Sequence, residues 1–148
     1  MPAVISPNVP EEIRARLTEI LTAVAALYPE ELVDTFASHG DEDGAPGRQF
    51  DSLWMFTEHY FGEVRNPLAN PQRLNFDVAP LKNSVDWLRL NAREYPNMAG
   101  ATETSRLELE FSTTDGLSGT LYAVGADCDR LMEIYRSYFQ ANLVSGDR

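Results

Sequence analysis

The chain has 148 residues, a length that suits one domain with a core of its own. Twelve Lys and Arg against 23 Asp and Glu give a formal charge of −11 at pH 7. This charge disfavours nucleic acids and anionic membranes as partners, because both are bound through clustered cations. The single cysteine, Cys128, excludes an intramolecular disulfide and a cysteine-rich zinc site.

The N-terminus has no signal-peptide pattern, and no run approaches the roughly 20 apolar residues of a membrane span. We therefore expect a cytoplasmic protein. Arginine is strongly preferred over lysine, since Lys82 is the only lysine, and this composition bias suggests a high-G+C bacterial genome.

Residues 1–40 predict a helical hairpin. Pro10 begins a helix whose apolar residues recur every three or four positions, namely Ile13, Leu17, Ile20, Leu21, Val24 and Leu27. Pro29 ends this helix and begins a second, shorter one that runs through Phe36 and stops near Gly40. Residues 41–50 follow as an acidic, flexible loop.

The aromatic segment 51–65 suits either a helix or a strand, and its Trp, Phe, Thr, Tyr and Val residues favour a strand or a tight hairpin. Residues 74–78 alternate like a strand that Pro80 ends. Residues 84–95 fit a strand with a bulge and, nearly as well, a helix that Ser84 caps. The sequence leaves this choice open.

The last third of the chain predicts a hairpin and a helix. Leu107, Leu109 and Phe111 alternate with polar residues, as in a strand with one wet face. A turn at residues 114–116 leads to a returning strand over residues 120–124. The final helix spans residues 126–144, is capped by Asp127, and has one face formed by Cys128, Leu131, Met132, Tyr135, Tyr138, Phe139 and Asn142.

Together these elements predict an α+β fold in a single domain, residues 1–148. We expect the N-terminal helical hairpin, an antiparallel sheet of about five or six strands over residues 51–125, and the C-terminal helix packed on that sheet.

Three stretches match the order of elements in a known family. LWMFTEHYFGEVR looks like its opening strands, LNFDVAPLKNSVDWLRL like a strand, a turn and a strand, and RLELEFSTTDGLSGTLYAVGADCDRLMEIYRSYF like its closing hairpin and C-terminal helix. Over about residues 50–144 the chain thus resembles the bacterial pleckstrin-homology and GRAM-like modules. The resemblance implies a binding scaffold rather than an enzyme. The chain departs from these modules in its N-terminal helices and in lacking their basic phosphoinositide-binding cluster.

Residues 39–44 partly match a calcium-binding loop. Asp41, Asp43 and Gly44 stand at matching positions, but His39 and Phe50 stand where the first and twelfth ligands belong. The twelfth position requires a bidentate carboxylate, which Phe50 cannot supply. We therefore predict a solvated acidic loop rather than a cation site.

The two histidines are a second candidate. His39 and His59 could bind a metal ion with Asp41 or Glu63, but two ligands far apart in sequence are a weak signal. Cys128 lies on an apolar helix face, which indicates a small core residue rather than a nucleophile. We predict no catalytic residue, no metal ion and no cofactor.

The aromatic segment indicates binding. Because its aromatic residues fall on both faces of a strand, one face requires a cover, supplied either by the N-terminal helices or by a partner. We predict a non-enzymatic interaction module that binds a protein or a second copy of itself, with a surface formed by Trp54, Phe56, Tyr60 and Phe61. The alternative is an α+β enzyme or small-molecule binder with a pocket lined by His59, Tyr60, Trp87 and Tyr122.

Overall fold

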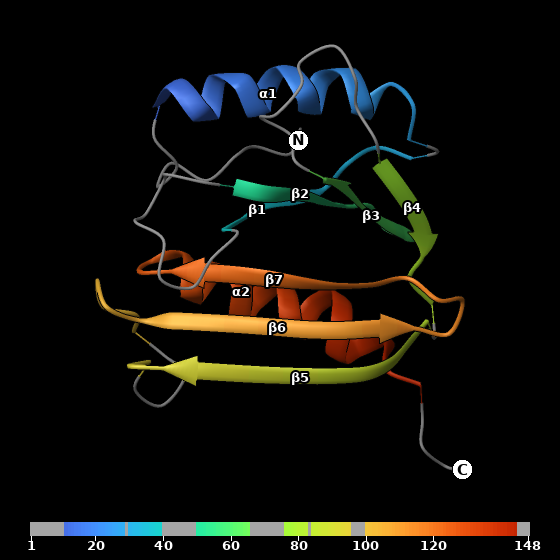
Figure 1. The fold of residues 1–148 in the computed structure, drawn as a ribbon. Helices are drawn as coiled ribbons and strands as arrows, with labels where there is room; N and C mark the ends of the chain where they lie inside the picture. Colours follow the sequence, from blue (N-terminus) through green and yellow to red (C-terminus); the bar gives the residue numbers. More distant parts are fainter. Residues whose placement is uncertain are drawn as a thin grey trace. The chain divides into compact units, whose positions relative to one another are not determined.

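The structure, a computed structural model, describes residues 11–28, 30–39, 50–65, 76–82, 84–95 and 100–144. The contacts divide the chain into two compact units, Met1–Ala79 and Pro80–Arg148. Each unit pairs helical structure with an antiparallel sheet (Figure 1), so the predicted α+β class is confirmed. The predicted acidic loop and its cation-loop pattern lie outside the described residues, except for the backbone of His39 and of Phe50.

The first unit contains one helix and a four-stranded sheet. Its elements are α1 (Glu11–Ala25), β1 (Asp34–His39), β2 (Phe50–Phe56), β3 (Tyr60–Arg65) and β4 (Phe76–Pro80). The strand order is β1-β2-β3-β4, and β1 with β2 and β2 with β3 are antiparallel. The preference for strand over helix in residues 51–65 is confirmed, since β2 and β3 form an antiparallel hairpin there.

Helix α1 covers one face of this sheet (Figure 1). The shared core consists of Leu17, Ile20, Leu21, Val24, Tyr28, Leu32, Ala37, Leu53, Met55 and Val64. The predicted apolar face of the helix is therefore confirmed as far as Val24. Leu27 is 68% exposed because the helix ends at Ala25.

The prediction of a second N-terminal helix is wrong. Residues Asp34–His39 form β1, in which Phe36 lies opposite Trp54 and Ala37 lies opposite Leu53. Every residue from Thr35 to Ser38 is buried, so both faces of this strand are covered and the alternation that marks a half-exposed strand is missing. Pairing with β2 decides the conformation here, rather than local preference.

The second unit contains β5 (Val85–Arg93), β6 (Arg106–Thr113), β7 (Ser118–Val124) and α2 (Asp127–Ile134), with strand order β5-β6-β7. The helix continues as a π-helical turn, Tyr135–Phe139, and a 3-10 turn, Gln140–Asn142. It packs on one face of the sheet (Figure 1), where the rings of Phe111 and Phe139 lie 4.8 Å apart. The predicted hairpin and C-terminal helix are confirmed.

Residues 84–95 form a strand with a bulge, which settles the choice that the sequence left open. Val85 lies opposite Thr113 and Trp87 lies opposite Ser112, so Asp86 is an extra residue in β5. The bulge changes the parity of the strand. As a result Val85, Leu88 and Leu90 share the face of Phe111, whereas Trp87 lies on the face away from α2.

Two details of the predicted fold require correction. The described strands form two sheets, of four and three strands, rather than one sheet of five or six, because β4 and β5 do not pair. Asp127 is the first helical residue rather than the cap; Ala126 takes the cap position and makes no side-chain hydrogen bond. Among the described residues no helix is long and apolar enough to cross a membrane.

Candidate functional site

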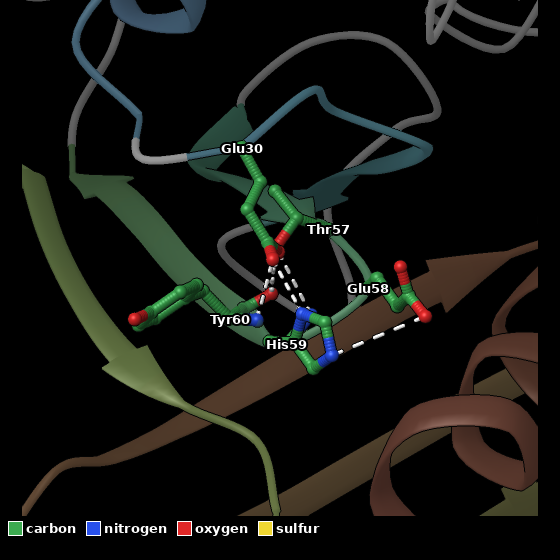
Figure 2. A network of polar contacts seen from close by, with 5 residues as sticks. All are labelled: Glu30, Thr57, Glu58, His59 and Tyr60. Carbon is green, nitrogen blue, oxygen red and sulfur yellow. Dashed lines mark hydrogen bonds and ion pairs between the residues drawn. The ribbon is translucent and has the colours of Figure 1, made fainter.

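A polar network joins the turn between β2 and β3 to the segment that precedes β1 (Figure 2). The Glu30 carboxylate accepts hydrogen bonds from the Thr57 hydroxyl at 2.7 Å and from the backbone N–H of His59 at 2.9 Å. Nδ1 of the His59 imidazole contacts the other oxygen of the same carboxylate. The Thr57 hydroxyl also accepts the backbone N–H of Tyr60 at 2.9 Å, which closes the turn.

The two ionisable groups of this network stabilise each other's charged form. The hydrogen bonds from His59 and Thr57 lower the pKa of Glu30 from its ordinary 4.5 to about 2. The hydrogen bond to Glu30, together with its negative charge, raises the pKa of His59 above its ordinary 6.5. The outer nitrogen of the imidazole lies 3.9 Å from Glu58.

This geometry limits what His59 can do chemically. An imidazole with a raised pKa stays protonated over a wider pH range, and in that form both ring nitrogens are donors. His59 is therefore better suited to hold the turn in place than to accept a proton from a substrate. Glu30 is the residue that sequence reasoning missed, because 29 positions separate it from His59 and no local pattern links them.

The ion pair predicts a bell-shaped pH dependence of stability. The contribution of His59 is complete below pH 6.5 and is lost as the pH rises through its raised pKa. The contribution of Glu30 is complete above pH 4.5 and is lost as the pH falls toward 2. We expect Glu30→Gln to lower the midpoint of urea denaturation most between pH 4.5 and pH 6.5, where both groups are charged. The effect should be smaller at about pH 9 and at about pH 3.

The matched control is Glu58→Gln, since Glu58 is exposed and only approaches the imidazole. Its effect on the midpoint should be small throughout the range. If Glu30→Gln lowered the midpoint equally at every pH, the ion pair would not be the cause.

Glu63, the carboxylate that we considered as a partner for His59, is held elsewhere. It accepts a hydrogen bond from the Ser52 hydroxyl, and Arg65 Nε donates to it at 3.1 Å. The structure thus brings His59 to Glu30 and Glu58, and Glu63 to Ser52 and Arg65. In the part of the chain that the structure describes, no cluster of His, Cys, Asp and Glu could hold a metal ion.

Cys128 is a buried residue of the second unit. Its sulfur faces the carbonyl oxygen of Ala123 at 3.6 Å, and burial raises its pKa to about 12. A thiol that stays protonated at neutral pH is a poor nucleophile. The side chain therefore acts as a small core residue, as the sequence indicates.

The candidate interaction surface in the aromatic segment is largely covered. Trp54, Phe56 and Phe61 are all 0% exposed, and their rings stack with centroids 6.4 Å apart for each neighbouring pair. Tyr60 is half-buried at the turn. Leu53 and Met55, on the opposite face of β2, belong to the core under α1, so both faces of this strand are buried.

The residues of the candidate pocket belong to different units. His59 lies exposed on the turn of the first unit. Trp87 and Tyr122 lie on β5 and β7 of the second unit, where Tyr122 is buried and Trp87 is 44% exposed. Trp87 is thus a large apolar side chain, predicted to line a pocket, that is exposed to solvent.

Trp87 forms a small cluster with charged neighbours on β5 and β6. The guanidinium carbon of Arg89 lies 5.3 Å from the Trp87 ring centroid, a cation–π distance. The same guanidinium contacts Glu110 across the strand pair at 3.4 Å. On the next pair the Asn91 amide donates to Glu108 at 3.1 Å. These contacts fix an aromatic ring and a cation side by side on the exposed face of β5.

Comparisons with protein-family models, with curated proteins and with solved structures found no match for this chain. The resemblance to pleckstrin-homology and GRAM-like modules stays a prediction, because nothing in these comparisons bears on it.

Proposed function

We propose that this protein is a non-enzymatic interaction module that binds an extended polypeptide segment along β5. The binding site is the β5 edge, which we define as residues Trp87–Arg93 on the side of β5 away from β6. Because β5 is the first strand in the order β5-β6-β7, no described strand pairs with it on this side, apart from the bridge between Val85 and Leu143. Such an edge is a template for a further strand.

The observation that carries the proposal is the exposure of Trp87 beside this edge. A tryptophan that is 44% exposed and held against Arg89 presents a large, preorganised contact surface. Tryptophan and arginine are enriched at the residues that dominate binding energy in protein interfaces. The state of the titratable groups also favours binding over catalysis, since His59 is held in an ion pair and Cys128 is buried.

Selection of extended peptides from a random display library tests this function. We expect the selected peptides to bind the intact chain and to lose at least about tenfold in affinity on Trp87→Ala, because an exposed aromatic anchor is removed. Their binding should shift the backbone amide resonances of β5 in an NMR titration.

Thr120→Ala is the matched control, because Thr120 is exposed on the same sheet face but lies on β7, at the other edge. This variant should bind the peptides as the intact chain does. Peptides whose binding is indifferent to Trp87, or whose resonance shifts fall outside β5, would overturn the proposal.

A further inference from the structure

Two leucines in the middle of β5 are incompletely covered, unlike their neighbours on β6. Leu88 and Leu90 are half-buried on the face toward α2, whereas Leu107 and Leu109 of β6 are fully buried on that same face. An additional strand beside β5 would place its own side chains next to these two leucines on the same sheet face. The free energy gained would come from the apolar area removed from water.

The end of the helical region limits where such a strand can lie. Leu143 pairs with Val85 in a parallel bridge, and the N–H of Val144 donates to the carbonyl oxygen of Val85 at 2.7 Å. These contacts occupy the start of the edge. No bridge to β5 on this side is found after the Asp86 bulge within residues 100–144, so a partner strand would lie along that stretch, the β5 edge as defined above.

We propose that the strand bound at this edge is β5 of a second copy of the chain, antiparallel to the first and related to it by a two-fold axis at Leu90. This inference rests on the proposed function and names its partner. The result is a symmetric dimer in which two three-stranded sheets join into one sheet of six strands.

The side chains of β5 complement one another in this register. Directly opposite residues of antiparallel strands lie on one sheet face, so Leu90 meets its own copy and Leu88 meets Ala92 on the apolar side. On the other face Arg89 lies opposite Asn91 of the second copy. There, too, Trp87 lies opposite Arg93 of the second copy, so no two arginines directly oppose each other.

Neighbouring registers are less favourable. With the axis at Arg89, the two copies of this arginine would oppose each other. With the axis at Asn91, Arg89 would oppose Arg93 twice, and like charges directly opposite one another destabilise a strand pair. With the axis at Leu88, the pairing would require the edge at Val85, which Leu143 already occupies. The register at Leu90 avoids all three conflicts.

Disulfide cross-linking between two different cysteine variants of the chain tests the register directly. In a mixture of Arg89→Cys and Asn91→Cys chains the two thiols lie directly opposite, with Cβ atoms about 4.5–5.5 Å apart, close to what a disulfide needs. Either variant alone places its thiols diagonally, at about 7–8 Å. We expect the mixture to form covalent dimers at least about tenfold faster than either variant alone. The unmodified chain is the control, since Cys128 is buried.

Sedimentation equilibrium tests the dimer itself. At a concentration of about 100 µM we expect the intact chain to sediment at twice its mass of 16.6 kDa. Asn91→Arg should shift the mass toward the monomer, because it sets an arginine opposite Arg89 of the second copy. Thr120→Arg adds the same charge to the same sheet face on β7 and should leave the dimer intact.

Each of the other outcomes contradicts a separate part of the inference. A monomer at every concentration would overturn the dimer, while peptides that depend on Trp87 would still support binding at the edge. A dimer that survives Asn91→Arg would lie on another surface. Faster cross-linking of Arg89→Cys alone would overturn the register. If the chain is a monomer and no peptide depends on Trp87, the proposed function fails as well.

Discussion

Replacement of Phe111 by alanine will lower the free energy of unfolding by about 3–5 kcal/mol, the largest loss that we expect from a single change in this chain. Phe111 lies on β6 and is almost completely buried. Its ring packs on that of Phe139 at 4.8 Å and an angle of 46°, which anchors the helical region to the sheet. Truncation removes apolar surface that folding takes out of water, and it leaves a cavity at this contact.

The loss can be measured by urea denaturation followed by circular dichroism, with Phe111→Leu and Trp87→Ala as controls. Phe111→Leu keeps much of the volume and should cost less than half as much as the truncation. Trp87→Ala removes a larger side chain from the surface and should change stability by about 1 kcal/mol or less. In a double-mutant cycle of Phe111→Ala and Phe139→Ala, the two rings should show a coupling energy of about 0.5–1.5 kcal/mol beyond the loss of buried apolar area. A loss below about 1 kcal/mol for Phe111→Ala would mean that the two rings do not form this contact.

Elements with one wet face were predictable from the sequence. In β6 the exposure of side chains alternates along the whole strand, so the pattern of Leu107, Leu109 and Phe111 is visible in the sequence. The buried residues of α1, such as Leu17, Leu21 and Val24, follow the helical period for the same reason. Where one side of an element faces solvent, the spacing of the polar residues on that side indicates whether the element is a helix or a strand.

Strands with two buried faces were harder to recognise. In β1 four consecutive residues, Thr35–Ser38, are buried, and their pattern allowed the helix that we predicted in error. In β2 both Trp54 and Met55 are fully buried, although on opposite faces. Composition alone identified β2 as a strand, because aromatic residues favour pleated surfaces. Its covered aromatic face, in contrast, could not be distinguished from an interaction surface.

Among the candidate sites, too, features set by local sequence were predictable, whereas features set by contacts between distant segments were not. The burial of Cys128 followed from its place on an apolar helix face, and the structure confirms it. The contact between Glu30 and His59 depends on the pairing of β1 with β2 and on the turn that follows β2, neither of which is a local property. The exposure of Trp87 depends on the bulge at Asp86, which turns the ring away from α2. A shift of one residue would place the indole on the opposite face.

Replacement of Gly62 by alanine will destabilise the first unit by about 1–3 kcal/mol, although alanine normally suits a strand better than glycine. Gly62 lies on β3 opposite Met55. A Cβ atom added at this position would overlap the backbone carbonyl oxygen of Asp77 on β4 and the hydroxyl of Tyr28. Since the carbonyl belongs to the backbone, β4 must move to make room, and that movement disturbs the edge of the sheet.

Tyr28→Phe separates the two contacts. Tyr28 is buried and stacks on Phe76 at 6.1 Å, and its hydroxyl makes no hydrogen bond within the described residues. Its removal should therefore change stability little by itself, because no hydrogen bond is lost. In the Tyr28→Phe background Gly62→Ala should cost less than in the intact chain, since only the Asp77 carbonyl still obstructs the Cβ atom. Thermal denaturation of the four chains measures this coupling. Strictly additive losses would show that Tyr28 does not lie against Gly62, and a stabilising Gly62→Ala would show that β4 does not approach β3 this closely.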